Sequence, residues 1–317
     1  MNQLKLSVIV VLLIFLSACG VAEFFIKRTV NGLEDKIVDE FSAYADFTAE
    51  QDREIELFAR DTANWVRSNR LPLLVKHLEQ TAADLERNGR LSETTWRDFV
   101  LFLEDPMVLS QAPDVVYRLA DLAYSLDSQQ TQQVLDRLSE DFSESLAERQ
   151  DQTADDRHDK IIKGTKQIFK AIGIKRSSSQ LKQARTMLQN RHDYAEQNIA
   201  SMIQNHTSFT ELLTDKGENP SEFRARFLAQ WKVAERPPSE SVPDAWEHNF
   251  VVSYGMMNYL LQDLTNAEQI DAVQGVLDYA ALFRELSTTD IQLGSNTLNQ
   301  LKHTIYDSPG SMPVSLK

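Results

Sequence analysis

The side chains that could do chemistry in this chain lie in two short stretches. Residues 154–160 read ADDRHDK and place His158 among three aspartates, a set that could bind a metal ion through nitrogen and oxygen ligands. No second histidine lies nearby, so we favour a charged turn before a helix, whose acids complement the positive end of the helix dipole. His192 and Glu196 are spaced by one helical turn and could support acid–base catalysis, although such a pair is more often a surface contact.

The linear motifs of common enzyme classes are absent from the sequence. It contains no Gly-x-Ser-x-Gly, no Walker loop and no His-Glu-x-x-His. The other histidines lack metal-like spacing; they are His77, His206, His248 and His303. We therefore expect no metal or other cofactor and favour a non-catalytic protein. An enzyme stays open as an alternative, because carboxylates that the fold brings together leave no linear motif.

The single cysteine, Cys19, follows an apolar run. Residues 6–16 are almost entirely apolar but fall short of the roughly 20 residues that span a membrane, so we predict a signal peptide over residues 1–18. Leu-Ser-Ala-Cys, ending at Cys19, resembles the bacterial lipobox, which implies cleavage before Cys19 and attachment of lipid to it. The alternative is an ordinary signal peptide followed by a free thiol. Gly20, where an aspartate would retain the protein in the inner membrane, predicts the outer membrane, facing the periplasm.

Composition limits the function of the mature chain. Removal of residues 1–18 leaves 317 − 18 = 299 residues and removes Lys5, so the formal charge changes from −14 to −14 − 1 = −15. Such an acidic chain is repelled by nucleic acid, which we exclude as a partner. If Cys19 carries lipid, no thiol remains for a disulfide, and the core must stabilise the fold unaided.

Most of the chain has the apolar spacing of amphipathic helices. Leucine and alanine recur every three or four residues between residues 70 and 87, and residues 135–146 repeat this pattern. Four segments have the spacing of a capping box, in which an N-cap oxygen and a Gln or Glu three residues later bond to each other's backbone; they begin at Thr48, Asp127, Ser177 and Thr265. No stretch alternates at period two. We predict an all-α fold, an array of about ten or more antiparallel helices that could pack as two halves.

A polar and charged segment, residues 143–160, is the candidate boundary between these halves. We therefore divide the chain into the signal peptide 1–18, an N-terminal helical half 19–152, a C-terminal helical half 153–307 and a flexible tail 308–317. Pro-Asp opens a predicted helix in each of the two halves. A duplication of one half would explain this, and so would the general preference for these residues at helix starts.

The segment after the lipobox resembles a known family. It reads IKRTVNGLEDKIVDEFSAYADFTAEQ from Ile26 and is followed by Trp65 and Leu71-Pro72. This is similar to a family of uncharacterised Gram-negative helical lipoproteins, known as a domain of unknown function, although members often carry aromatic residues where this chain has residues 29–35. The resemblance implies an all-helical, membrane-anchored envelope protein and no assigned activity.

A reversal of charge marks the strongest functional candidate. Between residues 157 and 185 there are nine Lys or Arg and one acid, a net charge of 9 − 1 = +8 in an acidic protein. Helical spacing puts one set of lysines on the side opposite the isoleucines and Phe169; this set is Lys160, Lys163, Lys166 and Lys170. Such a basic amphipathic helix could contact anionic lipid, an acidic protein partner or the chain's own acids. The alternative is a core-packed helix with a solvated basic face.

A second candidate is the apolar stretch 245–261. It could form a groove for apolar ligands, as Met-rich surfaces do, through Trp246, Phe250, Met256 and Met257; the alternative is plain core. Our leading expectation is a periplasmic, outer-membrane-anchored lipoprotein that binds or scaffolds a partner, held on the membrane by lipid at Cys19. A cell-envelope hydrolase and a carrier of lipid or peptide are the alternatives.

Overall fold

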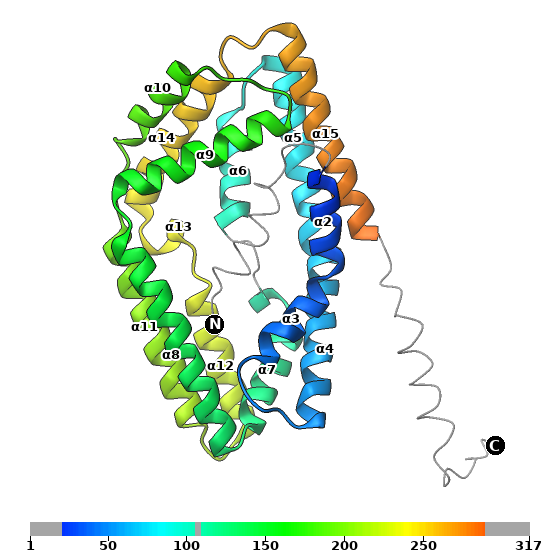
Figure 1. Ribbon diagram of the computed structural model, residues 1–317, viewed down its shortest axis with the longest axis vertical. Coiled ribbons are helices and arrows are strands. Elements are labelled where there is room, and N and C mark those ends of the chain that lie inside the picture. Colours follow the sequence, from blue (N-terminus) through cyan, green and yellow to red (C-terminus); the bar gives the residue numbers. More distant parts are fainter. Residues whose placement is uncertain (1–20, 105–108, 289–317) are drawn as a thin grey trace, which may run out of the picture. The chain divides into compact units, whose positions relative to one another are not determined.

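The computed structural model describes residues 21–104 and 109–288, and in these ranges the chain forms helices and no strands (Figure 1). This confirms the predicted all-α array. The predicted signal peptide, Cys19 and the predicted tail 308–317 lie outside the described residues. All described residues except Thr288 belong to one compact unit that ends at Ser287.

The helices, in chain order, are α2 (Val21–Asn31), α3 (Leu33–Ser42), α4 (Ala49–Trp65), α5 (Leu71–Asn88), α6 (Glu93–Glu104), α7 (Pro113–Ser125), α8 (Ser128–Asp151), α9 (Ala154–Ala171), α10 (Ser178–Leu188), α11 (Ala195–Thr214), α12 (Pro220–Ala234), α13 (Pro238–Ser241), α14 (Pro243–Leu261) and α15 (Asn266–Thr288). Over the described ranges, none of these helices is both long and apolar enough to cross a membrane.

The predicted capping boxes are present. At the start of α4, Thr48 Oγ1 accepts from the backbone N–H of Gln51 at 3.3 Å, and Gln51 Oε1 accepts from the backbone N–H of Thr48 at 2.9 Å. The same reciprocal bonds start α8, α10 and α15, at Asp127, Ser177 and Thr265. A fifth box, Thr153 with Asp156, starts α9 and was not predicted as one. Each box satisfies backbone donors that a helix start leaves unpaired, so these sequences fix where the helices begin.

Helices α4 and α5 continue into each other through one π-helical turn, Val66–Arg70. The sequence suggests that Pro72 marks a helix start, and it does lie in the first turn of α5, but the helical path does not break there. Proline lacks an N–H and clashes with the carbonyl four residues earlier. The wider turn, in which the N–H of Leu71 bonds to the carbonyl of Val66, accommodates it without a break.

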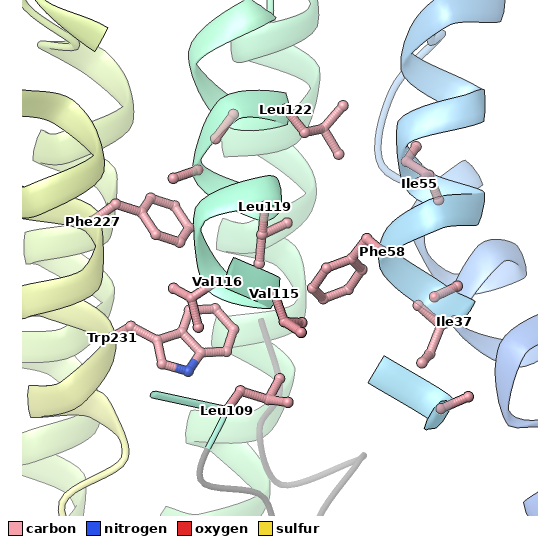
Figure 2. Packing of buried hydrophobic residues seen from close by; sticks show 14 of the residues in the cluster. Ile37, Ile55, Phe58, Leu109, Val115, Val116, Leu119, Leu122, Phe227 and Trp231 are labelled. Atoms are coloured by element: carbon pink, nitrogen blue, oxygen red, sulfur yellow. The ribbon is translucent and has the colours of Figure 1, made fainter. Parts of the chain in front are cut away.

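Three hydrophobic clusters hold the helices together. In the first cluster, Phe58 of α4 and Val116 of α7 lie between α3 and α12, and Phe227 and Trp231 of α12 close it on the other side (Figure 2). These side chains are buried, so the cluster joins residues that are more than 170 positions apart in the sequence. Burial of a large apolar side chain contributes about 1.5 to 3 kcal/mol, which makes this packing the main stabilising term.

The second cluster joins the end of α5 to α9, α10, α14 and α15; its fully buried members include Leu85, Leu188 and Leu260. The third cluster joins α2, α5 and the end of α15. Each of the three clusters takes residues from both sides of residue 152. The predicted boundary lies at the short break between α8 and α9, at residues 152 and 153. It separates two helices, but the residues on its two sides share the same hydrophobic clusters.

Candidate functional site

Helix α9 has one buried face and one basic face. Thr165 and Phe169 are buried, and Ile161, Ile162 and Ile168 pack partly buried against the second cluster. At about 100° per residue, the lysines of α9 fall on the opposite side. The amphipathic helix is therefore present in the form of the alternative stated above, a core-packed helix with a solvated basic face; contact of that face with a partner stays a prediction.

The side chains of Lys160, Lys163, Lys166 and Lys170, which we call the lysine face, are all exposed. Lys160 Nζ lies 3.6 Å from Glu148 Oε1 at the end of α8. Among the described residues, the other three lysines make no ion pair with an acid. Their charges are therefore left facing solvent.

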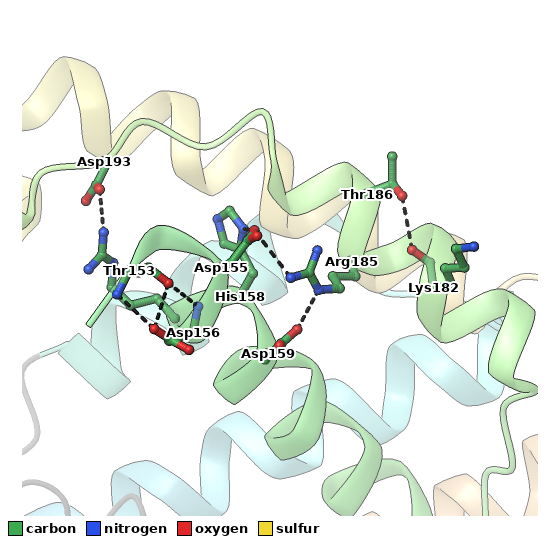
Figure 3. Close-up of polar contacts among 10 residues, drawn as sticks. Thr153, Asp155, Asp156, His158, Asp159, Lys182, Arg185, Thr186 and Asp193 are labelled. Carbon is green, nitrogen blue, oxygen red and sulfur yellow. Dashed lines mark hydrogen bonds and ion pairs between the residues drawn. The ribbon is translucent and has the colours of Figure 1, made fainter. Parts of the chain in front are cut away.

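The arginines of the same segment behave differently, because they pair with acids of the same chain. Arg157 binds Asp193 in the loop before α11, and Arg185 of α10 binds Asp159 and, at 3.3 Å, Asp155 of α9 (Figure 3). The guanidinium group presents several donors in a rigid fork, which suits it to bridge carboxylates. These pairs hold α9 against α10 and the loop, so part of the +8 charge serves the fold.

Arg176 is the most buried of these arginines, with a side chain 5% exposed. Its Nε donates to the carbonyl of Leu260 at 2.5 Å, and its Nη1 lies 3.3 Å from Glu268 Oε1. Arg176 thereby ties the segment between α9 and α10 to the end of α14 and the start of α15.

The acids of ADDRHDK cap a helix and do not form a separate turn. Asp155 and Asp156 lie in the first turn of α9, which corrects the expectation of a turn before it. The hydrogen bond from the Thr153 hydroxyl lowers the pKa of Asp156. Burial lowers the pKa of His158, and nearby arginines add to this effect. In the part of the chain that the structure describes, no group of three or more His, Cys, Asp or Glu is placed to hold a metal ion.

His192 and Glu196 do not share a helical face, contrary to the spacing argument. His192 precedes α11, whereas Glu196 lies in its first turn. The ring of His192 instead lies 4.2 Å from that of His248, centroid to centroid, and the backbone N–H of His192 donates to Asn249 Oδ1 at 2.7 Å. These contacts fasten the loop before α11 to α14.

The residues of the predicted apolar groove are core residues, which corrects that expectation. Trp246, Phe250 and Met256 are buried, and Met257 packs partly buried against the second cluster. Trp246 and Phe250 stack along α14 with ring centroids 5.5 Å apart, and the Arg97 guanidinium of α6 lies 3.9 Å from the Phe250 ring centroid. Trp246 and Phe250 thus form part of the contact between α6 and α14, and with Trp246, Phe250 and Met256 buried these residues do not line a groove.

Two buried charged side chains were not predicted from the sequence. Arg67, in the π-helical turn, is 6% exposed, and its Nη2 donates to the carbonyl of Val30 at 3.0 Å. Its Nε and Nη1 are buried and have no hydrogen-bond partner among the described residues. Glu104, at the end of α6, accepts a hydrogen bond from Trp246 Nε1, and burial raises its pKa to about 6. No local pattern marks either residue, because helices distant in the sequence bury them.

No family model, no curated protein and no solved structure matches the chain. The resemblance of residues 26–72 to the helical lipoproteins therefore stays a prediction, and the function must be argued from the surface of α9.

Proposed function

We propose that this protein is a non-catalytic, periplasmic lipoprotein of the outer membrane, anchored through Cys19, that binds or scaffolds a partner by presenting the lysine face of α9 to an anionic surface. One observation carries the proposal: the arginines of the basic segment pair with acids of the chain, whereas three exposed lysines of α9 have no such pair in the described residues; they are Lys163, Lys166 and Lys170. On a protein that is acidic overall, a positively charged surface is the region that attracts anions.

The two alternative functions have less support. A carrier would need the groove residues to be accessible, and Trp246, Phe250 and Met256 are buried. A hydrolase would need a partner for Glu104, whose raised pKa alone suits a general acid. Among the described residues, the polar groups that act on the Glu104 carboxyl are the Trp246 indole, the backbone of Ser239 and the charge of Arg191, and none of them is a second carboxyl or imidazole.

Binding of the unlipidated chain, residues 20–317, to vesicles tests the proposal. The test variant changes Lys163, Lys166 and Lys170 to Gln. Each lysine near an anionic surface contributes about 1 kcal/mol, so the triple variant should bind anionic vesicles about 100-fold more weakly at low salt. Raising the salt should weaken wild-type binding as well, because the Debye length shrinks to about 8 Å at physiological ionic strength.

A matched control removes the same charge elsewhere. Lys36, Lys76 and Lys232 are also exposed and lie on α3, α5 and α12, so their change to Gln alters net charge equally but leaves α9 intact. This control should bind like wild type. Equal weakening by both triple variants would mean that only net charge matters, and the assignment to α9 would be wrong.

A further inference from the structure

We infer that the lysine face of α9 rests on the same membrane that holds the lipid anchor, with anionic phospholipid head groups as its ligand. This inference builds on the proposed function and narrows its partner. It follows from the positions of α9 and of the first helix, α2, along one shared neighbour, α15.

The N-terminal half of α15 lies against the C-terminal end of α9. Gly275 of α15 approaches Ile172 so closely that a Cβ on Gly275 would lie 2.8 Å from the Cα of Ile172. Arg176, four residues further on, pairs with Glu268 of α15 at 3.3 Å. Ile172 is two residues after Lys170, so the lysine face ends close to this contact.

The C-terminal half of α15 lies against α2. Lys27 Nζ of α2 lies 2.9 Å from Glu285 Oε1, and Ile26 packs with Phe283 in the third cluster. Gly275 and Glu285 are ten residues apart on α15, which corresponds to about 15 Å along the helix. The contacts of α15 with α2 and with α9 are therefore neighbours along one helix.

The direction of α2 brings its start toward α9. Val30, near the end of α2, contacts Arg67, which lies before the first turn of α5. Glu79, three turns further along α5, pairs with Arg284 of α15, and the carbonyl of Leu85 accepts from Gln269 of α15, so α5 and α15 run in opposite directions. Val30 thus lies further toward the C-terminal end of α15 than Lys27, which pairs with Glu285 one residue after Arg284. Followed backward from Val30, α2 runs along α15 toward the contact with α9, as Figure 1 shows.

The anchor must lie near that start. Helix α2 begins at Val21, only two residues after Cys19, and two residues of chain span at most about 7 Å. A lipid on Cys19 therefore holds the α9 end of this unit close to the head groups. Tethering raises the local concentration of head groups to the millimolar range, so three unpaired lysines suffice for a contact that would be weak in free solution.

Lysine footprinting of the full-length lipidated chain in vesicles tests the inference. The protein is reconstituted in neutral vesicles or in vesicles containing anionic phospholipid, treated with an amine-acylating reagent, and digested for mass spectrometry. Lys163, Lys166 and Lys170 should react at least threefold more slowly on the anionic vesicles, and high salt should abolish the difference. Lys36, Lys76 and Lys232 serve as internal controls and should react equally on both, which excludes a general effect of the vesicle composition on the reagent.

The outcomes separate this inference from the proposed function. Equal reactivity of the α9 lysines on both vesicles would overturn the contact with the anchoring membrane. A second arm adds free anionic vesicles to protein that is anchored on neutral vesicles. The lysines could be protected in this arm and yet not be protected when the protein is anchored on anionic vesicles. The face would then bind anions while pointing away from its own membrane, so this inference would fail and the proposed function would stand. Full-length protein that washes off the vesicles would contradict the anchor and both proposals.

Discussion

Gln51 and Gln130 bond to each other through both ends of their side-chain amides. Gln51 Nε2 donates to Gln130 Oε1 at 3.0 Å, and Gln130 Nε2 donates to Gln51 Oε1 at 2.7 Å. Both side chains are buried, and each also completes the capping box of its own helix, at the start of α4 and of α8. Two helix starts that are 79 residues apart are thus joined by one amide pair.

Replacing Gln51 by Ala should destabilise the protein by about 2 kcal/mol, because it removes both bonds of the buried amide pair and the capping bond from the backbone N–H of Thr48. Chemical denaturation of the unlipidated chain measures this change. Gln180 provides the matched control, since it completes the capping box of α10 in the same way, and no hydrogen bond of its amide to another helix is found in the described residues. Gln180→Ala should lose less than about 1 kcal/mol. Equal losses would show that the amide pair adds nothing to the caps.

Stability should depend on the ionisation of Glu104. Its pKa is about 6 in the folded protein, above the ordinary value of 4.5, because burial disfavours the carboxylate. The folded state therefore binds the proton more tightly, and its stability falls as pH rises from about 4.5 to 6 and then levels off. Because the side chain is only partly buried, the loss should be about 1 to 2 kcal/mol.

Glu104→Gln should remove this loss, since the amide does not ionise. The measurement is the free energy of unfolding of both proteins at several pH values between 4 and 8. Taking the difference between wild type and variant cancels the titration of all other groups. A difference that does not vary with pH would show that Glu104 titrates alike in the folded and unfolded chains.

Two cations of the same basic segment should differ in their effect on stability. Arg176→Gln leaves the carbonyl of Leu260 and the carboxylate of Glu268 without their partner, which should destabilise the protein by about 2 to 3 kcal/mol. Lys170→Gln should change the unfolding free energy by less than about 0.5 kcal/mol, because the side chain is exposed. Thermal denaturation of both variants checks the contrast. A large loss in Lys170→Gln would mean that this lysine serves the fold and not a partner.

The lipid anchor should depend on Cys19 alone. Cys19→Ala removes the thiol that the lipobox resemblance assigns to the diacylglyceryl group, so the variant should neither mature nor incorporate lipid. Metabolic labelling with a fatty acid, followed by membrane fractionation, gives the readout. Cys19→Ser supplies a second variant with a hydroxyl of similar size. Lipid incorporation into either variant would contradict the assignment.

Local chemistry allowed much of the fold to be predicted. The reciprocal bonds at Thr48, Asp127, Ser177 and Thr265 join residues three apart, so their spacing in the sequence is sufficient to identify them. The buried stripe of α5 and the two-sided character of α9 follow from helical periodicity in the same way.

Contacts between distant segments could not be predicted in this way. Asp193, Glu268 and Leu260 determine which cations of the basic segment are used by the fold, and none of them lies in that segment. The hydrophobicity of residues 245–261 showed that they are apolar but not which helices cover them. Helix α6 does so through Arg97 and Trp96, and α10 packs on the same stretch in the second cluster. Only the exposure of the α9 lysines could be predicted from their spacing, because an amphipathic helix that packs on a core leaves its polar face outside.

The π-helical turn at Val66–Arg70 has a mechanical consequence. Because the chain does not break at Pro72, one helical path runs from Ala49 to Asn88, about 60 Å long, and it passes through all three hydrophobic clusters. A load applied through α2, which contacts this path in the third cluster and at Arg67, is therefore carried along the path from one cluster to the next. The path is interrupted at one place, the π-helical turn, where the backbone hydrogen bonds span five residues instead of four. Arg67 and Arg70 are buried at this turn.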